Sequence, residues 1–209
     1  MATNPTGGTS RNIVDHVKGI LTQPKLEWPV IDAEPTSIAD IYRNYVVILA
    51  AIPAICSAIG LFLMGAGLFR FSTSYIVGQA ILSYVLTLVG VYIFALILEA
   101  LAPSFGGTKD RVKAFKLAAY SWTAAWVAGV VLIIPLLGIL VLLAAIYGFY
   151  ILYLGVPVLM KVPEDKSVVY TVVAVVAMII IYFLISIVTT RIMWAMMPPV
   201  NTISFTYPG

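Results

Sequence analysis

Long stretches without a charged residue divide the chain into apolar segments. Four such stretches run over 44–69, 71–98, 117–160 and 167–190. A helix needs about 20 apolar residues to cross a bilayer, so the stretch over 117–160 has room for two spans. Pro135-Leu136-Leu137-Gly138 lies near its middle and predicts a tight turn, because proline lacks an amide donor and glycine readily ends a helix. The pattern therefore predicts five spans, over about 44–69, 71–98, 117–135, 139–160 and 167–190.

The apolar runs are continuous rather than alternating, which disfavours the strands of a β-barrel. We expect an all-α polytopic membrane protein, a bundle of five transmembrane helices. A segment over 1–43 precedes the bundle and a tail over 191–209 follows it. The first apolar run starts too late for a signal peptide, so the first span should stay in the mature protein. Prolines at positions 198, 199 and 208 disfavour a regular helix in the tail.

Composition supports a membrane protein. Hydrophobic residues make up 62% of the 209 positions and charged residues only 10%, too few to cover the surface of a soluble protein of this size. Soluble enzymes, disordered proteins and disulfide scaffolds are therefore excluded. The net charge of +3 gives no argument for a nucleic-acid partner. The single cysteine, Cys56, has no partner for an intramolecular disulfide.

Lys and Arg residues gather on one side of the predicted spans. Ten of the twelve lie before the first span, between the second and third, or between the fourth and fifth, and only Arg70 and Arg191 lie on the other side. Because cytoplasmic loops carry an excess of Lys and Arg, we expect the N-terminus in the cytoplasm and the C-terminus outside.

All nine acidic residues fall on the same expected cytoplasmic side, so a recognition surface of mixed charge should lie there. The alternative is that these charges only mark helix ends and keep the loops hydrated. The candidate partner-binding residues are Glu34, Asp40, Glu99, Lys109, Arg111 and Lys113.

The segment before the first span contains an apolar pattern of helical spacing. Residues 10–22 predict a short amphipathic helix that Ser10 can cap and Pro24 ends. Such a helix either lies flat at the lipid headgroups or packs against the ends of the spans. We expect His16 to be solvated on its polar side. The apolar face comprises Ile13, Val14, Val17, Ile20 and Leu21.

Two further signals lie between this helix and the first span. Trp28 and Pro29 predict an interfacial stretch with an aromatic anchor. Ser37 and Asp40 form a variant of the capping box, which predicts that the first spanning helix begins near residue 38.

No predicted span carries an ionisable residue in its interior. Such residues usually mark proton relays or ion paths, so their absence argues against a proton-coupled pump, a voltage sensor or an intramembrane protease. The second span instead carries a polar stripe, Tyr75, Gln79, Ser83 and Thr87, on one helix face. These side chains either hydrogen-bond between helices or line a solute path. We find no motif for catalytic residues, a cofactor or a metal ion.

Several motifs, in this order, resemble the Yip family of small five-span membrane proteins, and its bacterial branch in particular. They are Glu27-Trp28 with Glu34-Pro35, Phe-Gly-Gly within 101–107, Ala-Tyr-Ser within 114–121, and a Tyr-rich stretch over 146–161 that ends in Gly-Val-Pro. The proline that the family often has after Tyr-Ser is missing here. The resemblance implies a helical bundle with a cytoplasmic N-terminus, in the bacterial inner membrane. Similar eukaryotic proteins bind prenylated Rab-type GTPases.

Three functions are weighed from these features. The first is a non-enzymatic membrane protein that organises membrane, acts in trafficking or recruits a cytoplasmic or membrane protein partner, and an oligomer is compatible with it. The alternative is a transporter or channel for a small neutral or lipid-like solute, although five spans do not divide into equal inverted repeats. The third is an enzyme acting on lipid, for which Glu99, Asp110 and His16 are the available acid–base groups.

Overall fold

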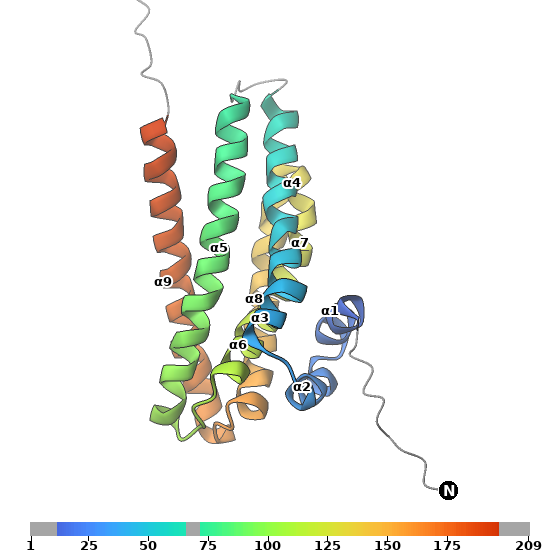
Figure 1. The fold of residues 1–209 in the computed structure, drawn as a ribbon, viewed down its shortest axis with the longest axis vertical. Helices are drawn as coiled ribbons and strands as arrows, with labels where there is room; N and C mark the ends of the chain where they lie inside the picture. The colour runs from blue at the N-terminus through green and yellow to red at the C-terminus, as the bar shows by residue number, and fades with distance from the viewer. Residues whose placement is uncertain (1–11, 66–71, 197–209) are drawn as a thin grey trace, which may run out of the picture.

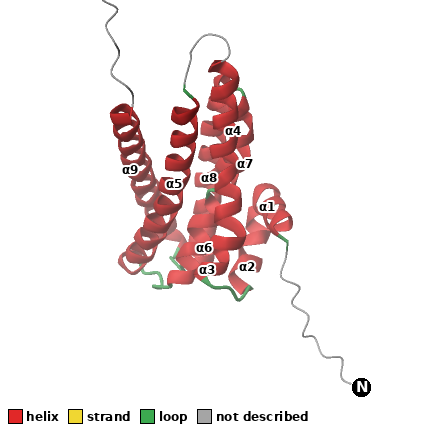
Figure 2. Cartoon of the chain, turned by 45° about the horizontal axis from the view of Figure 1, so that its top comes forward, coloured by secondary structure: helices red, strands yellow, loops and turns green. Residues whose placement is uncertain are grey.

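The computed structural model describes residues 12–65 and 72–196, and all regular structure in these two ranges is helical (Figures 1 and 2). Five helical segments are long and apolar enough to cross a membrane, which confirms the predicted five-span bundle. Their bounds are Ile38–Met64, Thr73–Phe105, Arg111–Ile133, Pro135–Leu159 and Glu164–Ala195. The expectations for Ser10, Arg70 and the prolines of the tail fall outside the described residues.

Two short helices, α1 (Ile13–Thr22) and α2 (Pro24–Ala33), precede the spans. The first two spans comprise α3 (Ile38–Ile41), the π-helical turn η1 (Tyr42–Val46), α4 (Val47–Gly65), α5 (Thr73–Leu101) and the 3-10 turn η2 (Ala102–Phe105). The remaining spans comprise α6 (Arg111–Ser121), α7 (Thr123–Ala128), the 3-10 segments η3 (Gly129–Ile133) and η4 (Pro135–Leu137), α8 (Gly138–Leu159) and α9 (Glu164–Met196).

Spanning helices extend beyond the charge-free windows because polar residues start them. The capping box is present, with Asp40 N donating to Ser37 Oγ at 3.1 Å, and the first helix begins at Ile38 as predicted. Asp110 caps α6 in the same way, so the third span starts six residues before the predicted 117. The fifth span begins at Glu164 instead of 167, since acidic residues are favourable in the first turn of a helix.

The third span occupies the centre of the bundle. In its most apolar stretch 61% of residues are buried, against 17% for the last span, α9. It is also broken into α6, α7 and η3. Gly129 lies at one break, where an added Cβ would stand 2.6 Å from Pro53 Cβ of α4. Helix α9 packs on α5 and α8 at the edge and leaves most of its large apolar side chains exposed, as a lipid-facing helix would (Figure 1).

The connections agree with the turn signals in the sequence. The predicted turn at Pro135 is η4, and α8 begins at Gly138. Gly106 of the Phe-Gly-Gly motif ends η2 with a φ of +80°, a conformation that favours glycine. An added Cβ on Gly107 would lie 2.6 Å from Met160 O, and the amide of Thr108 donates to the same oxygen at 2.8 Å. The motif therefore joins the connection after α5 to the connection after α8.

The segment before the first span departs from its predicted form. Pro24 does not only end one helix, because it also occupies the first turn of α2, where a missing amide hydrogen costs nothing. Of the two alternatives for α1, packing against the bundle is the one observed, with Tyr147 Oη of α8 donating to Leu21 O at 2.9 Å. Val14, expected on the apolar face, is exposed.

Candidate functional site

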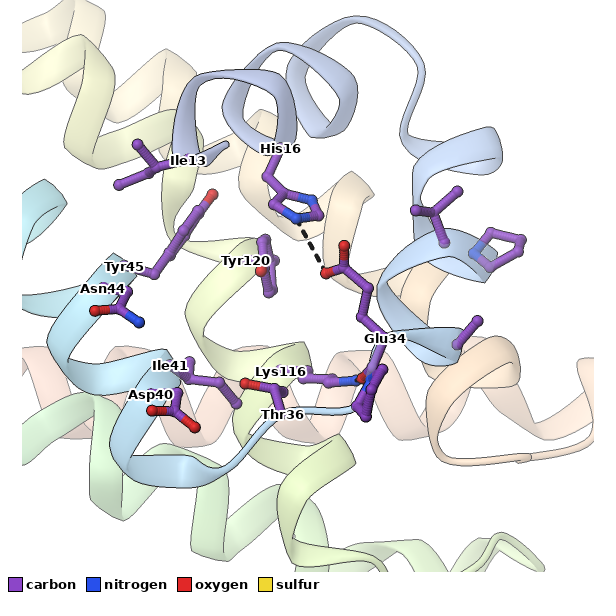
Figure 3. A pocket seen from close by; sticks show the side chains of 14 residues that line it. Ile13, His16, Glu34, Thr36, Asp40, Ile41, Asn44, Tyr45, Lys116 and Tyr120 are labelled. Atoms are coloured by element: carbon purple, nitrogen blue, oxygen red, sulfur yellow. Dashed lines mark hydrogen bonds and ion pairs between the residues drawn. The ribbon is translucent and has the colours of Figure 1, made fainter. Parts of the chain in front are cut away.

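A hollow of about 680 Å³ lies where α1 and α2 meet the bundle (Figure 3). Its walls come from α1, α2, the connection to α3, α3 itself, η1 and α6, so it depends on contacts between distant parts of the chain. The polar lining is His16, Glu34, Thr36, Asp40, Asn44, Tyr45, Lys116 and Tyr120, and apolar residues such as Ile13, Val30 and Ile41 complete it. The hollow therefore presents both charge signs beside apolar surface.

The imidazole of His16 is held between two carboxylates. Its Nδ1 lies 2.8 Å from Glu27 Oε1 and its Nε2 lies 3.1 Å from Glu34 Oε2. Both contacts are hydrogen bonds only when each ring nitrogen carries a proton, which is the imidazolium form. Glu27 packs against Gly19, where an added Cβ would collide with its carboxylate. The prediction that His16 is solvated is wrong, because the ring is buried and joins α1 to α2.

Lys116 completes the end of α2. Its Nζ donates to Ile31 O and Glu34 O, both at 2.6 Å. The last carbonyls of a helix have no hydrogen-bond partner within it. The buried ammonium supplies the missing donors, and its positive charge interacts favourably with the negative end of the helix dipole. Lys116 thus fixes the C-terminal end of α2 against α6 at the floor of the hollow.

Trp28 anchors α2 to the fourth span. Its side chain is fully buried and its Nε1 donates to Ile151 O of α8 at 3.0 Å. Gly155 makes room for the indole, since an added Cβ would lie 2.6 Å from Trp28 Cε2. This explains the glycine in the Gly-Val-Pro motif. The prediction of an interfacial aromatic anchor is wrong for Trp28, because the protein interior and not the headgroup region receives the ring.

A surface ion-pair cluster holds the other side of α2. Asp32 Oδ1 lies 2.8 Å from Lys113 Nζ and its Oδ2 lies 3.3 Å from Lys161 Nζ. Burial alone would raise the pKa of Asp32, but the two ammonium groups hold this pKa below its ordinary value. The cluster therefore connects α2 to α6 and to the connection between α8 and α9.

The six candidate partner-binding residues occupy different surroundings. Glu34 and Asp40 line the hollow. Glu99 is buried and pairs with Arg111, whose Nε donates to Glu99 Oε2 at 2.9 Å. Lys113 pairs with Asp32, and Lys109 is exposed. Their role in binding a partner stays a prediction. In the structure, Glu99, Arg111 and Lys113 form ion pairs that stabilise the fold.

Four important side chains were not among the candidate partner-binding residues. His16, Glu27, Trp28 and Lys116 fix the N-terminal helices on the bundle. Glu27 and Trp28 belong to the motif that carries the family resemblance, which was the signal available in the sequence. A lysine at the start of a span gives no such signal, because it resembles an ordinary loop charge.

The polar stripe faces a second cavity, of about 380 Å³, in the half of the bundle away from α1 and α2. Gln79, Ser83 and Thr87 line it, and Tyr75 does not. Ser83 Oγ donates to Ala80 O at 3.1 Å and Thr87 Oγ1 to Ser83 O at 2.8 Å, so these hydroxyls bond to their own helix. The two alternatives for the stripe, helix packing and a solute path, both stay predictions.

Among residues 12–65 and 72–196 no group of three or more His, Cys, Asp or Glu side chains could hold a metal ion. At the hollow, His16 contacts Glu34 and Lys116 bonds the end of α2, whereas Asp40 bonds within its own capping box. Glu99 and His16, which the enzyme hypothesis uses, lie in separate ion pairs.

Comparisons with known proteins agree with this architecture. The Yip1 domain matches over residues 18–188, from α1 into α9. Inner membrane protein YohC of Escherichia coli strain K12 and its counterpart in strain O6:H1 are each 26% identical over 162 residues, which cover 74% of this chain and 83% of the relative. No solved structure matches the chain. Since the domain match covers α2, the first four spans and most of the fifth, the chain belongs to the Yip1 domain family of integral membrane proteins.

Proposed function

We propose that this protein is a non-enzymatic integral protein of the bacterial inner membrane that recruits a protein partner at its cytoplasmic face. The observation that carries the proposal is the hollow between the N-terminal helices and the bundle, whose lining has both charge signs beside apolar side chains. The similarity to proteins named inner membrane protein supports the location.

The distribution of charge supports the orientation. In the described part of the chain, all nine acidic residues and nine of the ten Lys and Arg residues lie in α1, α2 or the ends and connections of the spans on that side, whereas Arg191 lies near the end of the fifth span. A surplus of Lys and Arg in the loops is typical of the cytoplasmic side. The hollow then opens on the cytoplasm.

Cysteine labelling tests the orientation. In a Cys56→Ala background, we expect Leu136→Cys in the exposed turn between α7 and α8 to react with a membrane-impermeant maleimide in intact spheroplasts. Lys109→Cys, which is exposed at the opposite end, should react only after permeabilisation. Labelling of Lys109→Cys in sealed spheroplasts would place the hollow outside and contradict the proposal.

The surroundings of the hollow define the partner. The contact of His16 with Glu34 and the hydrogen bond from Lys116 to Glu34 O hold its walls in place, so a partner meets a preformed surface. Apolar residues beside single charges of each sign favour a short protein segment over a uniformly charged molecule.

A matched pair of substitutions on α2 tests partner recruitment. Ala33 and Leu26 are both exposed, but only Ala33 lines the hollow. We expect Ala33→Trp to obstruct the hollow and lower recovery of the bound partner about tenfold or more, which corresponds to ~1.4 kcal/mol of binding free energy. Leu26→Trp should leave recovery unchanged. The measurement is quantitative affinity purification from native membranes in mild detergent, and equal recovery with both variants would refute recruitment through the hollow.

A further inference from the structure

We infer that the second cavity, in the half of the bundle away from α1 and α2, is a binding site for a neutral membrane lipid whose head carries carbonyl oxygens. All five spans contribute to its wall, and its volume is about 380 Å³, within the usual range for ligand sites. The site is separate from the hollow on which the proposed function rests.

The lining is polar but carries no charge. Gln79, Ser83 and Thr87 of α5 face a second set of hydroxyls on α9, those of Ser186, Thr189 and Thr190. Asp, Glu, Lys, Arg and His are absent from the residues that line the cavity. A charged headgroup or a free ion would find no counter-charge there, so the chemistry selects a neutral ligand.

Two polar atoms in the wall of the cavity lack a hydrogen-bond partner among the described residues. They are the indole Nε1 of Trp122 and the Oγ1 of Thr189, and both are buried. An unpaired polar group in an apolar environment is unfavourable, and an indole nitrogen can only donate. With the amide of Gln79 nearby in the lining, the wall has donors that require acceptor oxygens from a ligand.

The remaining lining determines where the rest of the ligand lies. Trp122 and Trp126 are stacked, with ring centroids 6.4 Å apart and planes 17° apart, and provide a flat apolar face. Tyr182, Ser186 and Thr190 of α9 are exposed, so the cavity opens beside α9 toward the lipid phase. A hydrocarbon tail can leave through this opening. An acyl chain alone would leave the polar atoms unpaired, whereas a carbonyl-bearing head would satisfy them.

Carbonyl oxygens on a neutral lipid come from two sources, the ring of an isoprenoid quinone or the esters of a diacylglycerol. Quenching of tryptophan fluorescence distinguishes them, because Trp122 and Trp126 lie in the wall. Full-length protein carrying Trp194→Phe, which removes a lipid-exposed indole, is reconstituted in nanodiscs. The probes are decylubiquinone, a diacylglycerol with brominated acyl chains, and a phosphatidylglycerol with the same chains as the charged control.

We expect saturable quenching by one neutral probe and only the linear quenching of lipid contact by phosphatidylglycerol. Ser83→Leu should abolish the saturable component because it fills the cavity, and Ser74→Leu, on an exposed turn of the same helix, should retain it. Thr189→Val preserves shape and should weaken binding about three- to tenfold, the effect of one neutral hydrogen bond. Unchanged thermal unfolding of Thr189→Val establishes that the loss is not a folding defect.

The outcomes divide clearly. Saturation by the quinone or by the diacylglycerol supports the site and identifies the source of the carbonyl oxygens. Saturation by phosphatidylglycerol to the same extent overturns the selection of a neutral head. Linear quenching by all three probes, or equal binding by Ser83→Leu and the parent protein, overturns the site itself and leaves partner recruitment at the hollow unaffected.

Discussion

Replacing Trp28 with Ala is expected to weaken the attachment of α2 to the bundle by about 3–5 kcal/mol, the usual cost of deleting a buried tryptophan side chain. The indole is fully buried, donates to Ile151 O and fills the space beside Gly155. Its removal leaves a cavity and deletes the hydrogen bond to Ile151 O. Because α2 carries one wall of the hollow, the hollow should be lost with it.

Two measurements check this expectation. Unfolding by SDS in mixed micelles gives the change in free energy. Limited trypsin digestion reports whether the chain is cleaved faster after Lys25, an exposed residue of α2 whose peptide bond the attached helix protects. Trp194→Ala is the control, since that side chain is 70% exposed and should cost under about 1 kcal/mol. Equal stability of both variants, with Lys25 protected in each, would show that Trp28 does not hold α2.

The spans could be predicted from the sequence because the bilayer imposes a local rule. About 20 consecutive apolar residues are needed to cross the bilayer, independently of the rest of the chain. The rule therefore predicts the number of spans correctly even where the predicted and observed ends of a helix differ. The ends differ because charged residues also occupy helical turns. Lys116 lies inside α6 because its ammonium reaches the carbonyls of α2, a partner that no charge count includes.

The packing of the N-terminal helices could not be predicted from a local rule. Trp28 and Gly155 are far apart in sequence. Nothing in the sequence around either residue indicates that the indole of Trp28 fills the space beside Gly155. A tryptophan before a span is typical of the headgroup region. A histidine on the polar side of an amphipathic helix is typically solvated. Both expectations are wrong because of tertiary packing. Trp28 and His16 can be buried since the polar atoms of their side chains have partners inside the protein.

The polar stripe was predicted in part. A spacing of four residues puts Gln79, Ser83 and Thr87 on one face of α5, and the structure has them on one wall. The opposite wall comes from α9, where Ser186 and Thr190 are also four apart. Sequence spacing identifies each face separately, but only the packing of α9 against α5 brings the two faces around one cavity.

The contact of His16 with two carboxylates allows a sharp comparison within one site. We expect Glu27→Gln to lower the free energy of unfolding by about 1.5–3 kcal/mol, the range for a hydrogen bond to a charged group, because a neutral amide replaces the buried carboxylate that contacts His16. Glu34→Gln removes the same charge from the other side of the ring and should cost about 1 kcal/mol or less. The Glu27 side chain is 5% exposed and the Glu34 side chain 29%, so water compensates only the second change.

SDS unfolding of Glu27→Gln, Glu34→Gln, His16→Gln and the double variant Glu27→Gln/His16→Gln measures the difference. In the double variant no imidazole is left to lose a partner, so its cost should be smaller than the sum of the costs of Glu27→Gln and His16→Gln. Equal effects of Glu27→Gln and Glu34→Gln would mean that burial does not set the strength of these contacts. Glu27, which an interfacial segment would leave in water, is instead the residue through which α1 and α2 become one unit on the bundle.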